Sequence, residues 1–110
     1  MKKSKLEFDI ELDINQVPER ITMDSSDNQV EKLEIKSLMV SAWDSKKKES
    51  LTVDLWTKDM MINDMYIMYH QTLHSMASSL ERSTGHHKLA GALRDYCAFF
   101  AEQTRILSKD

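Results

Sequence analysis

The feature of this sequence that most constrains its fold is a change of hydrophobic period within residues 50–80. The segment SLTVDLWT, residues 50–57, alternates polar and apolar side chains, which is the pattern of a β-strand. After the short stretch KDMMIN, apolar residues recur every three or four positions up to residue 80, which is the pattern of an amphipathic helix. We therefore expect strands before this point of the chain and helices after it.

The chain opens with a second alternating segment, KLEFDIELD at residues 5–13. Period two over this length predicts a half-buried strand with one apolar face and one wet face. The wet face carries four carboxylates, which in another setting would suggest a cation site or a catalytic carboxylate pair. The sequence supplies neither a cleft nor unequal environments for them, so we interpret this face as solvated.

Residues 34–57 predict a β-hairpin with a four-residue loop, Ser45–Lys48. This register pairs Ala42 with Leu51, Val40 with Val53 and Leu38 with Leu55, so one face is wholly apolar. The opposite face then carries Met39, Ser41, Trp43, Thr52, Asp54 and Trp56. Two interpretations stay open: the segment 14–33 packs over this face, or the face meets another protein.

Residues 14–33 form the least regular part of the sequence, with its only proline, Pro18, and a turn cluster at residues 24–28. A short strand at Arg20–Met23 is one interpretation and a partner-binding loop is another. The choice decides whether the sheet has three strands or four.

The first helix is predicted to begin with Asn63 as its N-cap and to end near residues 83–84, with Gly85 in the left-handed region. A second helix is predicted from about Lys88 to Leu107, where the interior Gly91 suggests close packing against Ala77. The expected fold is α+β in two layers: an antiparallel sheet of three or four strands with a C-terminal helical hairpin on one face, in the order β-β-β-α-α. At 110 residues we expect one domain, residues 1–110.

Composition excludes several functional classes. The net charge of −3 argues against a nucleic-acid partner and against an anionic membrane as the main partner. The single cysteine, Cys97, rules out an intrachain disulfide and favours a reducing compartment. No stretch has the length and hydrophobicity of a membrane span, and no apolar run follows the N-terminal lysines, so we expect no membrane insertion and a cytoplasmic protein.

Candidate chemistry is sparse. His70 and His74 lie one helical turn apart and could share a metal ion, but no third ligand follows from the spacing, so we favour solvated histidines. Cys97 lies beside the apolar stripe of the second helix with no local histidine to activate it, which predicts a structural cysteine. Neither a glycine-rich phosphate loop nor a nucleophile elbow is present. We expect no enzymatic activity and no cofactor.

The sequence resembles the GldC family of gliding-motility-associated proteins from Bacteroidetes. The stretches that carry the likeness are FDIELD at 8–13, VPERITMDSSDN at 17–28, SAWD at 41–44, LTVDLWTKDM at 51–60, HQTLHSMA at 70–77 and DYCAFFAEQ at 95–103. Met61 stands where a proline opening the helix is expected, and Lys46–Lys48 is more basic than the usual hairpin tip. The resemblance implies a cytoplasmic accessory protein linked to gliding motility and its secretion machinery, without catalytic residues, cofactor or defined ligand.

The main functional hypothesis is a non-enzymatic adaptor that binds a protein of unknown identity. The residues expected to contact this partner are Met39, Trp43, Asp54, Trp56 and Lys58. Two alternatives belong to other classes: a small metal-binding protein that uses His70 and His74, and a structural module that associates with itself as a homodimer.

Overall fold

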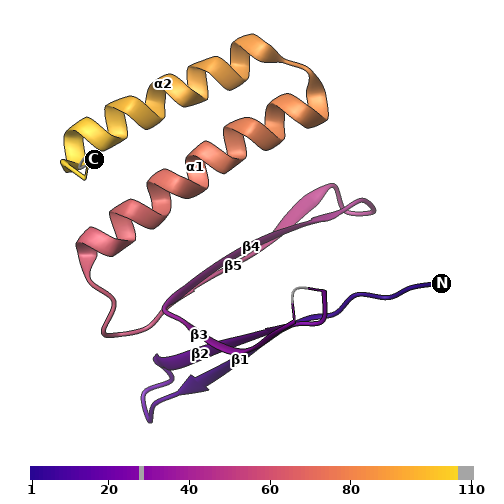
Figure 1. Ribbon diagram of the computed structural model, residues 1–110, viewed down its shortest axis with the longest axis vertical. Coiled ribbons are helices and arrows are strands. Elements are labelled where there is room, and N and C mark those ends of the chain that lie inside the picture. The colour runs from indigo at the N-terminus through magenta and orange to yellow at the C-terminus, as the bar shows by residue number, and fades with distance from the viewer. Residues whose placement is uncertain (28, 107–110) are drawn as a thin grey trace. The chain divides into compact units, whose positions relative to one another are not determined.

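The structure is a computed structural model that describes residues 1–27 and 29–106. This part of the chain forms five strands followed by two helices, an α+β fold as predicted (Figure 1). The elements are β1 (Leu6–Leu12), β2 (Pro18–Ser25), β3 (Val30–Ile35), β4 (Ser37–Asp44), β5 (Glu49–Trp56), α1 (Ile62–Thr84) and α2 (His87–Thr104). They divide into two compact units, Met1–Met60 with the strands and Met61–Asp110 with the helices, and each unit is described by itself.

In the first unit, β1, β2 and β3 form an antiparallel sheet with β2 in the middle. Ile21 of β2 lies opposite Ile10 of β1 and Ile35 of β3, and it is fully buried. The alternation predicted for residues 5–13 places the apolar side chains of β1 on the same face as Ile21, because directly opposite residues of an antiparallel pair share a face. The core of this sheet is therefore centred on β2.

The segment 14–33 contains β2 and most of β3, so the predicted order β-β-β-α-α is wrong and the observed order has five strands. The strand expected at Arg20–Met23 is longer, Pro18–Ser25, and β3 was missed. A bulge explains the omission: Lys32 has a positive φ of 49°, its N–H donates to Asp24 Oδ1 at 2.9 Å, and the pairing register shifts there. The bulge breaks the alternation on which recognition of a strand depends.

The remaining strands form a separate two-stranded sheet, the β4–β5 hairpin, whose predicted register is confirmed. Val40 lies opposite Val53 and Asp44 opposite Glu49, with the predicted four-residue turn between the strands. Lys48 closes the turn in a left-handed conformation, with φ of 57°, and its N–H donates to the carbonyl of Asp44 at 2.9 Å.

In the second unit, α1 begins two residues earlier than predicted. Its N-cap is Met61 and not Asn63, which lies inside the first turn, and no side chain among the described residues caps this end. At the other end Gly85 has φ of 73° and its N–H donates to the carbonyl of Glu81 at 2.8 Å, which confirms the predicted left-handed cap. The second helix begins at His87, because Nδ1 of His86 accepts the N–H of Leu89 at 3.1 Å. Its predicted end at Leu107 lies outside the described residues.

The two helices of this unit contact each other through small side chains. Ala77 of α1 and Ala90, Cys97 and Ala101 of α2 are buried, and small side chains at these positions let the helix backbones approach closely. Cys97 is buried, in agreement with its predicted structural role. The explanation offered for Gly91 is wrong, because a Cβ atom at that position meets no atom of the described residues within 4 Å.

Packing of both helices on one face of a sheet, and a single domain over residues 1–110, stay predictions. In the part of the chain that the structure describes, no helix combines the length and hydrophobicity needed to cross a lipid bilayer.

Candidate protein-binding surface

One face of the β4–β5 hairpin carries four of the five residues predicted to contact a partner. Met39 lies opposite Asp54, and Trp43 and Trp56 follow on the same face by the alternation of the strands. Trp43 is 63% exposed and Trp56 is 52% exposed, while Met39 is half-buried and Asp54 is exposed. We call the face formed by Met39, Trp43, Asp54 and Trp56 the tryptophan face.

A shallow hollow of about 220 Å³ lies beside Trp56. It is lined on one side by Asp54, Leu55 and Trp56 of β5 and on the other by Gln16, Val17 and Pro18. The segment 14–33 therefore borders Trp56 and leaves it half exposed, and contact of this face with another protein stays a prediction. The hollow is mostly apolar, and the carboxylate of Asp54 supplies a charge at its wall.

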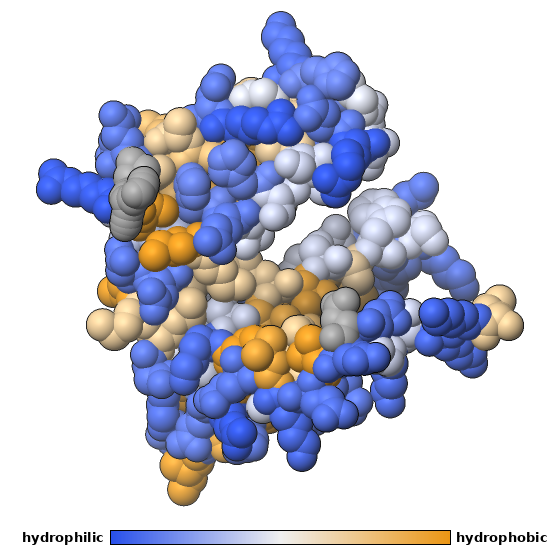
Figure 2. All heavy atoms as spheres, in the orientation of Figure 1, coloured by the Kyte–Doolittle hydropathy of each residue, from blue (hydrophilic) through white to orange (hydrophobic). Residues whose placement is uncertain are grey.

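The opposite face of the same hairpin also exposes apolar side chains, those of Val40, Leu51 and Val53. Figure 2 shows hydrophobic side chains at the surface among hydrophilic ones. Exposed apolar area alone therefore does not single out the tryptophan face. What distinguishes it is its two large aromatic side chains, because indole rings combine a large apolar area with a polar N–H.

Lys58, the fifth predicted contact residue, is engaged inside the first unit. Its ammonium lies 2.8 Å from Asp13 Oδ2 and 3.3 Å from Glu19 Oε2, and its N–H donates to the carbonyl of Pro18 at 3.1 Å. The hydrogen bonds that Lys58 donates to Asp13 and Glu19 raise the pKa of Lys58, and the hydrogen bond from Lys58 lowers the pKa of Asp13. Lys58 thus stabilises the segment that lines the hollow.

The same carboxylate, Asp13, shapes the loop between β1 and β2. Its second oxygen, Oδ1, accepts the N–H groups of Asn15 at 2.8 Å and Val17 at 3.0 Å, which is a turn closed by a side chain. One side chain therefore folds the loop and also binds Lys58 at the end of β5. Val17 reaches the wall of the hollow through this arrangement.

A second group of polar contacts lies beside Lys58. Thr57 is buried, its N–H donates to the carbonyl of Lys36 at 2.8 Å and its Oγ1 donates to Asp59 Oδ1 at 2.7 Å. Asp59 Oδ2 in turn lies 3.1 Å from Lys36 Nζ. The hydrogen bonds from Thr57 and Lys36 lower the pKa of Asp59, and the hydrogen bond that Lys36 donates to Asp59 raises the pKa of Lys36. We call the contacts of Thr57, Lys58 and Asp59 the junction. They connect the end of β5 to Lys36, between β3 and β4, and to the segment 13–19.

No sequence pattern predicts Asp13, Glu19 and Lys36 as partners of the junction. Lys58 and Asp13 are 45 residues apart, and no local pattern connects such distant positions.

The histidine pair lies in the helical unit. The ring centroids of His70 and His74 are 5.3 Å apart with the rings edge to face, and the His70 ring stacks on Phe100 at 6.3 Å. Within residues 1–27 and 29–106, no cluster of three or more histidine, cysteine, aspartate or glutamate side chains is arranged to hold a metal ion. Metal binding by this pair stays a prediction.

A polar cluster joins the two helices at their connection. Glu81 Oε1 accepts a hydrogen bond from Arg94 at 2.7 Å, and Oε2 lies 2.7 Å from His87 Nδ1. The hydrogen bond from His87 and then that from Arg94 lower the pKa of Glu81. This cluster connects the end of α1 to the start of α2.

The family model described as "Gliding motility-associated protein GldC-like" matches residues 18–106 of the chain. The chain belongs to the GldC-like family. A search of curated proteins and a search of solved structures found no match.

The GldC-like match covers the hairpin, the junction residues and both helices. It therefore includes the tryptophan face and the run LTVDLWTKDM that supported the resemblance most specifically. It begins at Pro18, so the opening strand β1 and Asp13 lie outside the matched range. The ion pair between Asp13 and Lys58 thus joins a residue before the GldC-like range to one inside it.

Proposed function

We propose that this GldC-like protein is a non-enzymatic, cytoplasmic adaptor that serves gliding motility and its secretion machinery by binding a protein partner through the tryptophan face. The observation that carries the proposal is the pair Trp43 and Trp56, both more than half exposed on one face of the β4–β5 hairpin. Tryptophan is enriched among the residues that dominate binding energy at protein interfaces.

The hollow beside Trp56 indicates what the partner presents. Its apolar lining, from Val17, Pro18 and Leu55, fits an aliphatic or aromatic side chain of a partner. Asp54 forms no ion pair with any described residue, so its carboxylate is free to bind a lysine or arginine next to that side chain. We therefore expect a partner segment with one apolar side chain flanked by one basic residue.

The charged groups support an adaptor in preference to an enzyme. The described residues whose pKa values shift, Asp13, Lys36, Lys58, Asp59 and Glu81, all take part in ion pairs or hydrogen bonds within their own unit. Shifted pKa values with such a cause are typical of structural ion pairs, whereas a catalytic acid or base needs access to a substrate.

The first step of the test identifies the partner in cells of the source organism. A photoreactive amino acid replaces Trp43, and crosslinked proteins are identified by mass spectrometry. The matched control carries the same photoreactive group in place of Phe99 of α2, which is 51% exposed and therefore close to Trp56 in accessibility. A partner that crosslinks from position 43 and not from position 99 is then purified.

The second step measures the affinity of that partner for the variants Trp43→Ala, Trp56→Ala and Phe99→Ala by calorimetry. We expect each tryptophan variant to bind at least about thirtyfold more weakly, since an interface residue of this kind contributes about 2 kcal/mol or more. Phe99→Ala should bind like the wild type. If both tryptophan variants keep the wild-type affinity and the wild-type circular dichroism spectrum, the tryptophan face is not the binding surface.

A further inference from the structure

The outer edge of the first sheet is formed by β1, which is paired on one side only. Within the described part of the first unit, β1 is hydrogen-bonded to β2 and to no other strand. The carbonyl of Lys5 and the N–H of Asp13 bond towards β2, to Ser26 and Val17. Backbone groups of alternate residues point to opposite edges of a strand, so the odd-numbered residues of β1 face β2.

The even-numbered residues of β1 therefore direct their N–H and C=O groups to the open edge. These residues are Leu6, Phe8, Ile10 and Leu12. An edge of this kind is a template for one more strand, because its backbone donors and acceptors are already in position.

The edge of β1 lacks the bulge that protects the other edge of this sheet. On β3, the bulge at Lys32 turns the N–H of that residue inward to Asp24, which interrupts the row of outward groups. In the pairing of β1 with β2 the register shifts only next to Leu12, where the extra residue, Glu19, belongs to β2. From Leu6 to Glu11 the edge of β1 is regular.

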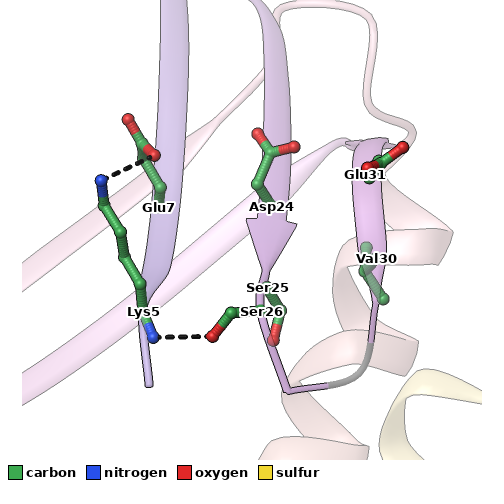
Figure 3. A pocket seen from close by; sticks show the side chains of 7 residues that line it. All are labelled: Lys5, Glu7, Asp24, Ser25, Ser26, Val30 and Glu31. Atoms are coloured by element: carbon green, nitrogen blue, oxygen red, sulfur yellow. Dashed lines mark hydrogen bonds and ion pairs between the residues drawn. The ribbon is translucent and has the colours of Figure 1, made fainter. Parts of the chain in front are cut away.

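The charged side chains along this edge indicate which charge an added strand should carry. Glu7, Asp9 and Glu11 lie on one face of β1, and Asp9 and Glu11 form no ion pair with any described residue. Glu7 is 3.6 Å from Lys5, and both side chains are exposed. Figure 3 shows Asp24 on β2 and Glu31 on β3 around one pocket with Glu7. At the other end of β1, Arg20 of β2 lies opposite Glu11, so the charge of this face is acidic on β1 itself and mixed further from the edge.

The opposite face of β1 is apolar, with Leu6, Ile10 and Leu12 exposed. A strand added beside β1 therefore complements both faces of β1 if its side chains alternate between basic and apolar. A second copy of β1 does not meet this requirement. Any pairing of two copies that keeps the apolar faces together places carboxylates opposite carboxylates, and like charges in that position are destabilising.

We propose that β1 binds an extended segment of another protein, with lysine or arginine alternating with apolar residues, as an additional strand of the sheet. This contact is separate from the tryptophan face. It goes beyond the proposed adaptor function by assigning a second partner site of stated chemistry.

The test uses the full chain and synthetic peptides of about eight residues, the length of an ordinary strand. The probe peptide alternates lysine or arginine with valine. One control peptide has the same composition in scrambled order, and another has glutamate in place of every basic residue. Amide hydrogen exchange, followed by NMR, reports each backbone N–H of β1 separately.

In the free protein, we expect the amides of Phe8 and Ile10 to exchange fast and the amide of Asp9 to exchange slowly, because only the last one bonds to β2. At millimolar concentration the alternating basic peptide should protect Phe8 and Ile10 and leave Asp9 unchanged. Neither control peptide should do so. Slow exchange of Phe8 and Ile10 in the free protein would show that the edge is already covered, and it would overturn the proposal.

A charge-reversal variant tests the electrostatic part of the argument. Asp9→Lys should weaken binding of the basic peptide about five- to tenfold and strengthen binding of the acidic one, because it replaces cross-strand attraction with repulsion. Glu102→Lys on α2 changes the net charge equally, at an exposed position outside the strand unit, and should leave both affinities unchanged. Equal binding of basic and acidic peptides, or protection confined to residues outside β1, refutes the proposal.

The proposal for the tryptophan face and the proposal for the edge of β1 can be refuted separately. The double variant Trp43→Ala and Trp56→Ala should keep the full protection of Phe8 and Ile10 by the basic peptide. Loss of that protection would mean that the peptide binds the tryptophan face and not the edge of β1.

Discussion

Replacing Ile21 tests whether β2 holds the core of the strand unit. Ile21 has no exposed surface and lies between Ile10 and Ile35 on the two neighbouring strands. Ile21→Ala removes three carbon atoms from this site, which corresponds to about 2.4 kcal/mol at about 0.8 kcal/mol for each buried CH₂ group. The cavity left behind adds to this loss, and the total expected for such a change is about 2–5 kcal/mol.

Two further variants make the measurement quantitative. Ile21→Val removes a single carbon atom and should cost about 0.5–1.5 kcal/mol. Ile14→Ala makes the same chemical change as Ile21→Ala at a side chain that is 93% exposed. It should alter the free energy of unfolding by no more than about 0.5 kcal/mol.

The assay is urea unfolding, followed by circular dichroism and by the fluorescence of Trp43 and Trp56, both in the strand unit. The midpoint should fall in the order wild type, Ile21→Val, Ile21→Ala, with Ile14→Ala close to wild type. A cost for Ile21→Ala no larger than that for Ile14→Ala would refute the assignment of the core to the centre of β2.

Three other predictions concern backbone conformation, helix packing and pH. Gly91→Ala should raise the free energy of unfolding by about 0.5–1 kcal/mol, because a methyl group there meets open space, whereas Gly85→Ala should lower it, because φ is 73° at that cap. Thermal unfolding of both variants checks this pair. Ala77→Leu should lower stability by about 1–3 kcal/mol by overpacking the helix contact, and Ala92→Leu, at an exposed position, should have little effect in the same urea assay. The pKa of Asp13 is lowered from its ordinary value of 3.8, so the ionised carboxylate stabilises the fold above that pH and this stabilisation is lost as the pH falls through the folded-state pKa. The loss of stability between pH 7 and pH 3 should therefore be smaller in Asp13→Asn than in wild type. An equal loss would contradict the role of this carboxylate.

Sequence patterns predicted the parts of the fold that rest on local periodicity. The register of the β4–β5 hairpin followed from the apolar pairs, because any shift by one residue turns an apolar set outward. Gly85 was recognisable as a helix cap because glycine adopts a left-handed conformation without steric cost. Both features depend on residues near each other in the chain.

The features that the sequence did not predict depend on interrupted patterns or on distant residues. The bulge at Lys32 disrupts the alternation of β3, so that strand was missed. The engagement of Lys58 with Asp13 and Glu19 followed from no local pattern, although Lys58 itself was singled out from the sequence as a partner contact. Alternation placed Trp43 and Trp56 on one face, but their exposure depends on which other segments pack there, and local periodicity carries no information about that.

The junction also has a consequence for the order in which the chain folds. The β4–β5 hairpin closes through a four-residue turn, and the two helices are joined by a short connection, so both form from residues close in sequence. The junction instead brings Lys58 to Asp13, across 45 residues of chain. Closing so long a loop costs conformational entropy before the contacts of Lys58 can form. During synthesis, β1 and β2 emerge from the ribosome well before the lysine that fastens their connecting loop. The β1–β2 hairpin, whose loop is closed locally by Asp13, therefore lacks its contact with Lys58 until the end of β5 has been made.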